Sequence, residues 1–253
     1  MTQQRSFEKY GRFDDEAGEF IITDPYPPRP WINYLSNHRM MAILNQGAGG
    51  MVYHGSAATG RMTRHHQFRA VPVGQPGPWV YVREKSGRLW SPSFEPCRTP
   101  LTDWRCRHGL GRSTYEGTYR GLAAEVTYFI APDDDVLLWD IRLRNGRSRP
   151  AQVLVAPFVE FSFLYALEEV MYYHWSKGTV RFAYDRRRKA IKYHYVHYYS
   201  PRRFPVFLSA SRAPAGFTCD RDAFIGRAGT YAEPAQLVAG ELGGEELPGG
   251  GLG

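Results

Sequence analysis

Cysteine is scarce in this sequence, and its placement argues against two kinds of small scaffold. The 253 residues contain three cysteines, Cys97, Cys106 and Cys219, an odd number with no CxxC pair. Disulfide frameworks need paired cysteines, and zinc sites need closely spaced ligands, so this pattern favours neither. Reduced thiols are typical of the cytoplasm, and we therefore expect a cytoplasmic protein.

Long hydrophobic runs are also missing. The longest apolar stretches, such as residues 153–159, are far shorter than the ~20 residues that a membrane-spanning helix requires. Residues 1–5 are not followed by the apolar region of a secretory signal. The sequence therefore predicts no membrane helix and no signal peptide. Its length is sufficient to bury a core, in one large domain or two small ones.

No complete catalytic motif occurs in the chain. It lacks GxSxG, a P-loop, and a GxGxxG that follows a strand. The Gly-rich residues 47–50 lie among predicted strands, which favours a tight turn over a phosphate cradle. On strands, His65 and His66 would face opposite sides, as would His194 and His197, so neither set chelates a metal easily. We predict no catalytic residue, no metal site and no cofactor in this chain.

Acidic residues form two clusters and one isolated candidate. Residues 14–16 and 133–135 are adjacent acids on predicted turns, where side chains diverge and stay solvated. A glycosidase instead holds two carboxylates across a sugar ring. Glu160 differs because it lies in an apolar strand, between Val159 and Phe161. An unpaired buried carboxylate would have a raised pKa, but pairing with an arginine is more common, and we expect such a pair.

The sequence is rich in aromatic residues, at 15%, and in short β-forming runs between turn signals. We predict strands at residues 18–23, 79–83, 123–130, 136–144, 151–163, 191–198 and 204–211. The run 136–144 ends at Asn145-Gly146, a strong hairpin signal. One short helix is predicted at residues 164–170. Strands at this spacing are typical of an all-β sandwich or barrel.

Positive charge is concentrated in one segment. Residues 181–203 contain eight basic residues and one acidic residue, so they carry 8 − 1 = +7, equal to the net charge of the whole chain. A compact basic patch can attract nucleic acid or phosphate. Charge patterning favours the alternative, a solvated hairpin turn. Because no nucleic-acid-binding module accompanies the patch, we expect no nucleic-acid partner.

The last stretch of the chain differs in composition. Seven of the 14 residues from 240 to 253 are glycine, and none is aromatic. Such a segment buries too little apolar surface to offset the entropy lost on ordering. We therefore predict a β-sandwich domain at residues 1–236 that lacks its last strand or strands, and a disordered end at residues 237–253.

Ten segments, in sequence order, resemble the N-terminal domain of glycoside hydrolase family 94, the inverting disaccharide phosphorylases. Each segment alone is a weak signal, but together they extend from residue 10 to about residue 234. They are 10–16 (YGRFDDE), 23–25 (TDP) with 28–35 (PRPWINYL), 48–50 (AGG), 61–64 (RMTR), 90–92 (WSP), 106–111 (CRHGLG), 124–129 (AEVTYF), 139–141 (WDI), 159–161 (VEF) and 220–227 (DRDAFIGR).

The resemblance implies a large antiparallel β-sandwich, a supersandwich of the galactose-mutarotase type, with at most one or two short helices. In the family, a helical linker and an (α/α)6 barrel follow this domain. The barrel supplies the catalytic Asp and binds inorganic phosphate, the co-substrate that cleaves a β-linked disaccharide to α-glucose 1-phosphate. The barrel would begin beyond residue 253, so we expect this chain to be inactive alone.

The resemblance also implies a role for the loop that follows residues 159–161. In the family, this domain helps to form a homodimer, and the loop approaches the acceptor end of the neighbouring active site, often with a Gln-Arg pair. The matching positions here are His174, which could bond a sugar hydroxyl, and Trp175, which could stack on a sugar ring. An ordinary loop pair is the alternative for these residues. A standalone carbohydrate-binding sandwich is the alternative for the chain.

Overall fold

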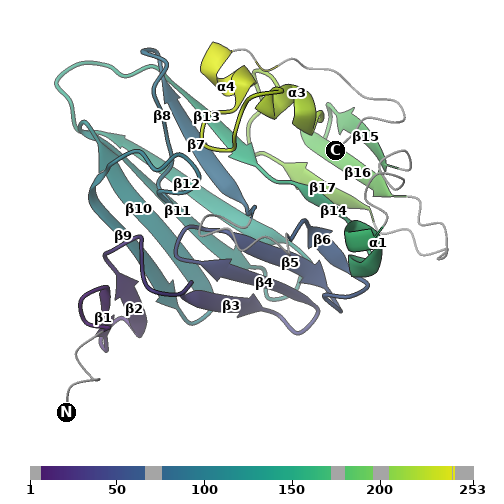
Figure 1. The fold of residues 1–253 in the computed structure, drawn as a ribbon, viewed down its shortest axis with the longest axis horizontal. Helices are drawn as coiled ribbons and strands as arrows, with labels where there is room; N and C mark the ends of the chain where they lie inside the picture. The colour runs from purple at the N-terminus through teal and green to yellow at the C-terminus, as the bar shows by residue number, and fades with distance from the viewer. Residues whose placement is uncertain (1–6, 66–75, 172–179, 196–204, 241, 243–253) are drawn as a thin grey trace.

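The computed structural model describes residues 7–65, 76–171, 180–195, 205–240 and 242, which form mainly antiparallel sheets (Figure 1). The largest sheet has six strands in the order β1-β2-β9-β10-β11-β12. Their bounds are β1 Gly11–Asp14, β2 Glu19–Ile22, β9 Thr102–Gly109, β10 Arg112–Tyr119, β11 Leu122–Ile130 and β12 Leu137–Asn145. Burial alternates along all nine residues of β11, as expected for a strand with one face on the core.

The described residues also form three smaller sheets. One has the order β14-β6-β5-β4-β3, a second β13-β7-β8, and a third β15-β16-β17. Their bounds are β3 Ile32–Ser36, β4 Met40–Asn45, β5 Gly50–His54, β6 Arg61–Thr63, β7 Trp79–Glu84, β8 Leu89–Trp90, β13 Val153–Phe158, β14 Phe161–Leu164, β15 Val180–Asp185, β16 Ala190–Tyr195 and β17 Val206–Ser209.

One hydrophobic core joins the six-stranded sheet to the sheets of β3–β6 and of β7 and β13. Trp79, Tyr115 and Tyr128 are among its largest fully buried side chains. The Tyr115 hydroxyl donates to the Asn45 carbonyl at 2.7 Å, and the Tyr128 hydroxyl donates to the Pro78 carbonyl. Each phenol therefore places a ring in the core and satisfies its polar end across the layers, which fixes the layers to each other.

Three short helices are described: α1 Ala166–Met171, α3 Arg221–Ile225 and α4 Ala235–Ala239. The first confirms the helix predicted at residues 164–170. The expectation of at most two helices was too low, because five-residue helices are too short to show a helical repeat of apolar residues. The domain boundary predicted at residue 236 falls inside α4, where Leu237 is fully buried. No helix in the described part of the chain is long and apolar enough to cross a membrane.

The hairpin predicted at Asn145-Gly146 is wrong, because β12 and β13 belong to different sheets. The Gly146 N–H donates to the Gly121 carbonyl at 2.9 Å. The Arg147 guanidinium then reaches the Glu84 carboxylate on β7 at 2.7 and 3.0 Å. These contacts lead the chain away from β12 to pair with β7. The strand predicted at residues 151–163 is likewise divided, into β13 and β14.

Candidate functional site

Glu160 lies where the chain leaves β13 for β14, and it is 6% exposed. Its carboxylate forms ion pairs with Arg64 and, at 3.1 Å, with Arg221. It also accepts a hydrogen bond from the Tyr231 hydroxyl at 2.6 Å. The predicted arginine pairing of Glu160 is therefore confirmed, with two arginines instead of one.

The electrostatics of Glu160 do not suit a proton donor. Burial disfavours the charged carboxylate, but the charges of Arg64 and Arg221 and the Tyr231 hydrogen bond outweigh burial. The pKa of Glu160 is consequently lowered from its ordinary value. A general acid at neutral pH needs a raised pKa, so Glu160 is an ionised structural centre that ties β6, β14 and the segment around α3 together.

A second buried cluster lies beside the first, around Glu169 of α1. The Glu169 carboxylate accepts from the His65 main-chain N–H at 3.0 Å and from the Ser162 hydroxyl, and Arg61 lies 3.6 Å away. Burial raises the pKa of Glu169 despite these contacts. On the neighbouring Glu168, the carboxylate accepts from the hydroxyl of Tyr195 on β16. Together these contacts fix α1 against three strands.

The proposed acceptor-site residues His174 and Trp175 lie outside the described residues, in the segment directly after α1. Their predicted role therefore stays a prediction. What the described residues establish is the anchoring of the preceding helix through Glu168 and Glu169, both of which are buried.

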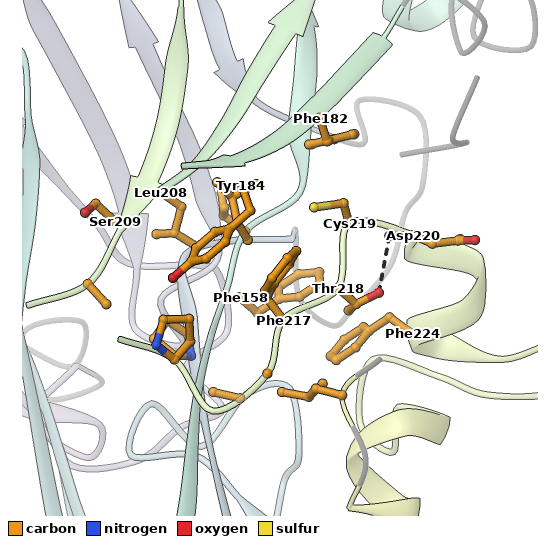
Figure 2. Close-up of a pocket in the computed structure, with 18 of the residues that line it drawn as sticks. Phe158, Phe182, Tyr184, Leu208, Ser209, Phe217, Thr218, Cys219, Asp220 and Phe224 are labelled. Carbon is orange, nitrogen blue, oxygen red and sulfur yellow. Dashed lines mark hydrogen bonds between the residues drawn. The ribbon is translucent and has the colours of Figure 1, made fainter. Parts of the chain in front are cut away.

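An apolar pocket of about 230 Å³ adjoins the Glu160 cluster. Figure 2 shows aromatic rings from distant segments gathered around it, including Phe158, Tyr184, Phe217 and Phe224. The Phe158 and Phe224 rings stack with centroids 5.4 Å apart, and the Tyr184 and Phe217 rings with centroids 4.4 Å apart. The lining comes from residues 154–161 and from residues 182, 184, 189, 191, 208–210, 214–221, 224 and 242.

Polar side chains at the pocket are engaged within the protein. The Asp220 carboxylate caps α3 by accepting from the Ala223 N–H at 3.0 Å, and the Thr218 hydroxyl accepts from the Asp220 N–H at 3.3 Å. Lys189 donates to the Ser211 carbonyl at 2.8 Å, and Ser209 donates to the Arg188 carbonyl at 3.0 Å. The pocket therefore offers shape and apolar surface more than free hydrogen-bonding groups.

The other charged candidates form surface ion pairs or turns. Asp135 pairs with Arg39 at 2.7 Å and with His54 at 3.0 Å. Within the described ranges, no three His, Cys, Asp or Glu side chains converge as metal ligands. The three cysteines, all within the described residues, are not joined in disulfides.

The basic segment begins as the predicted solvated hairpin. The strands β15 and β16 pair in antiparallel fashion, and Arg186, Arg187 and Arg188 are exposed at their turn. Asp185 pairs with Lys192 at 2.7 Å and with Arg188 at 2.9 Å, and these bonds lower the Asp185 pKa. Residues 196–204 lie outside the described part of the chain.

The sequence carries no signal for the pocket. Its walls come from residues 154–161, 208–210, 214–221, 224 and 242 and from four residues between 182 and 191, which are far apart along the chain. Only Glu160, which stood out as a charge in an apolar run, marked one edge of this region in advance.

The fold defines the class of the protein as a large antiparallel β-sandwich domain built from several sheets. The chain belongs to glycosyl hydrolase family 94, since the model of that family's supersandwich domain matches residues 18–250. The family and the fold predicted from the sequence are thus confirmed.

Curated relatives agree with this assignment. The chain is 32% identical over 241 residues to the N,N'-diacetylchitobiose phosphorylase of Vibrio proteolyticus, over 93% of this chain and 29% of that protein. It is 30% identical over 238 residues to the corresponding enzyme of Vibrio furnissii, and the match covers 92% of this chain and 29% of that enzyme. It is also 30% identical over 233 residues to the solabiose phosphorylase of Paenibacillus borealis, and the match covers 91% of this chain and 30% of that enzyme. The chain thus spans less than a third of the length of these relatives.

Proposed function

We propose that this chain is the supersandwich portion of an inverting phosphorylase that cleaves a β-linked gluco-disaccharide or oligosaccharide with inorganic phosphate. The observation that carries the proposal is the match of the family's supersandwich model to residues 18–250. The phosphorylase relatives, named for chitobiose and solabiose, support it at 30–32% identity. The three free cysteines support a cytoplasmic location.

In the proposed reaction, phosphate attacks the anomeric carbon while a carboxylic acid of the catalytic barrel protonates the departing sugar oxygen. Phosphate takes the place of the base-activated water of an inverting hydrolase, and the products are a sugar α-1-phosphate and a shortened sugar. We assign neither catalytic role to this portion. Glu160, a buried ion-paired acid of this portion, has a lowered pKa, and its contacts with Arg64, Arg221 and Tyr231 are structural.

The role proposed for this portion is to supply homodimer contacts and a rim for the acceptor sugar through His174 and Trp175. The anchored helix α1, which directly precedes them, supports this role. Buried Glu168 and Glu169 connect α1 to β6, β14 and β16. A loop that leaves a fixed helix can hold a sugar-stacking ring with less loss of entropy on binding.

A domain exchange tests the function. The region of the Vibrio proteolyticus enzyme that matches this chain is replaced by this chain, and phosphorolysis of N,N'-diacetylchitobiose is followed by sugar 1-phosphate formation. We expect a folded, active chimera with a changed KM for the acceptor in the reverse reaction. Changing His174 and Trp175 to Gln and Arg in that chimera should restore the acceptor KM without a comparable change in kcat. A folded but inactive chimera would contradict the proposal.

The purified chain alone separates the proposal from a standalone carbohydrate-binding sandwich. It is given α-glucose 1-phosphate with glucose, N-acetylglucosamine, cellobiose or gluconate, and phosphate release is measured beside an intact family member. We expect release from the control only. Tight binding of a β-linked oligosaccharide by the isolated chain, with no activity in the chimera, would favour the standalone binding module.

A further inference from the structure

Strand β12 is the last strand of the six-stranded sheet, and among the described residues β11 is the one strand that pairs with it. Burial differs between these two neighbours. Every core-facing residue of β11 is buried, whereas Trp139, Ile141 and Leu143 of β12 are only partly buried. A further strand beside β12 would cover these three side chains. The sheet therefore ends at β12 with apolar surface still exposed to solvent.

The hydrogen bonds at the two ends of β12 fix the direction of its main-chain groups. The Ala131 N–H donates to the Val136 carbonyl at 3.0 Å, and the Gly146 N–H donates to the Gly121 carbonyl at 2.9 Å. Both pairs continue the register of β11 and β12. Hydrogen-bonded positions alternate along an antiparallel strand, so the even-numbered positions of β12 bond to β11. The odd-numbered positions from 137 to 145 direct their N–H and C=O groups away from β11.

This edge of β12 is complementary to a second copy of itself. An antiparallel pair about a two-fold axis at Ile141, perpendicular to the sheet, keeps the core-facing sides of both copies on one side. Asp140 of each copy then lies opposite Arg142 of the other, and Trp139 lies opposite Leu143. Opposite charges that face each other stabilise paired strands. Even-numbered positions are the non-hydrogen-bonded ones across this edge, where facing side chains lie closest.

Charge selects this register over its neighbours. Moving the axis by one residue places Asp140 or Arg142 opposite the same residue of the other copy. Moving it by two residues toward the C-terminus places Arg142 opposite Arg144. Moving it by two residues toward the N-terminus places Asp140 opposite the uncharged Leu138. Like charges that face each other destabilise paired strands, so the axis at Ile141 is the favoured one.

We propose that two copies of this chain pair along their β12 edges about this axis, so that their six-stranded sheets become one continuous sheet. The outward main-chain groups of the two strands bond to each other, and Trp139 of each copy covers Leu143 of the other. A two-fold interface of this kind uses the same surface on both subunits and closes as a dimer. The inference rests on the proposed function for the homodimer, and it names the surface that makes the contact.

Sedimentation equilibrium of the purified chain, without sugar or phosphate, tests the interface. We expect a mass that rises with concentration from 28.9 kDa to twice that value. Asp140→Arg and Arg142→Asp each place like charges opposite one another across the axis, so each variant should raise the dimer dissociation constant at least tenfold. An equimolar mixture of the two variants should form a heterodimer about as tight as the wild-type dimer, because opposite charges then face each other again. Circular dichroism checks that both variants fold.

Three outcomes would overturn the proposal. A chain that stays monomeric at every concentration would mean that the charges of β12 protect its edge from pairing. A dimer that neither variant weakens, or a mixture that restores nothing, would place the contact on another surface. Growth beyond the dimer would mean that unlike edges, such as β12 and β1, join copies into an open chain.

Hydrogen exchange tests the strand pairing at single amides. Raising the protein concentration should slow exchange at Trp139, Ile141 and Leu143 at least tenfold, whereas Asp140 and Arg142, whose amides bond to β11, should be protected throughout. No slowing at the odd-numbered amides of a dimer would contradict strand pairing. The chimera assay reads phosphorolysis instead. An inactive chimera beside an intact β12 dimer would refute the proposed function alone, and an active chimera beside a monomeric chain would refute this interface alone.

Discussion

Glu160 keeps a negative charge in the protein interior because Arg64, Arg221 and Tyr231 all contact its carboxylate. Removing one partner of a buried ion cluster leaves the others unpaired, which typically costs about 3–5 kcal/mol. We therefore expect Glu160→Ala to lower the free energy of unfolding by about that amount. Urea unfolding followed by tryptophan fluorescence measures it.

The control is a carboxylate with similar partners on the surface. Asp135 pairs with Arg39 and His54, but its side chain is 44% exposed. Solvent screens such pairs, so Asp135→Ala should change the unfolding free energy far less than Glu160→Ala. Equal losses in the two variants would mean that the Glu160 cluster contributes no more than a surface pair.

The two buried glutamates predict opposite pH windows. Glu160 has a lowered pKa, so its contribution to stability is present above the ordinary glutamate pKa of about 4.3 and is lost as pH falls through the lower folded value. Glu169 has a pKa raised by burial, so its contribution is present below about 4.3 and is lost as pH rises through the higher folded value.

Unfolding free energies measured from acid to neutral pH should separate the contributions of Glu160 and Glu169 to stability. We expect Glu160→Gln to weaken the loss of stability as pH falls below about 4.3, and Glu169→Gln to weaken the decline in stability as pH rises above it. Parallel curves for the wild type and both variants would contradict the assignment of these shifts.

At the scale of elements, α3 depends on its N-cap. The Asp220 carboxylate accepts the Ala223 N–H, and the first residue of the helix, Arg221, carries the pair with Glu160. Replacing an Asp cap by Ala costs about 0.5–2 kcal/mol, whereas Asn caps as well as Asp. Asp220→Ala should therefore destabilise the protein by about that amount, and Asp220→Asn should be close to neutral. Thermal unfolding of both variants checks this, and equal shifts would argue against the cap.

Elements with strict alternation could be predicted from the sequence, and those governed by distant contacts could not. In β11, every second residue is buried, and its bounds match the predicted strand within one residue. At Asn145-Gly146 the predicted hairpin does not form, because the Arg147 contact with Glu84 directs the next strand to β7. A local motif carries no information about a partner 63 residues away.

The same limit applies to the candidate site. Glu160 could be singled out because a charge interrupts an apolar strand, and that contrast lies within a few residues. The pocket could not be found this way, because Phe158, Tyr184 and Phe217 meet only after three separate segments fold together. Neither the sequence pattern nor the composition predicts contacts between segments that are far apart along the chain.

At the scale of the whole molecule, the described residues form one main core and two smaller clusters. The main core joins three sheets and contains residues such as Trp79, Tyr115 and Val126. One of the smaller clusters, Phe182, Tyr193, Tyr195 and Val206, belongs to the sheet of β15–β17. Two hydroxyl contacts, from Tyr193 to the Ser162 carbonyl and from Tyr195 to Glu168, connect this sheet to β14 and α1.

Regions with fewer buried contacts open with a lower free energy than the core. We therefore expect native-state hydrogen exchange to show smaller opening free energies for amides of β16 than for amides of β10 and β11. Tyr193→Phe, which removes one of the two connecting hydroxyls, should widen this difference without changing exchange in β11. If β16 and β11 exchange with the same free energy in both proteins, the sheet of β15–β17 opens only with the whole molecule, and its cluster forms one cooperative unit with the main core.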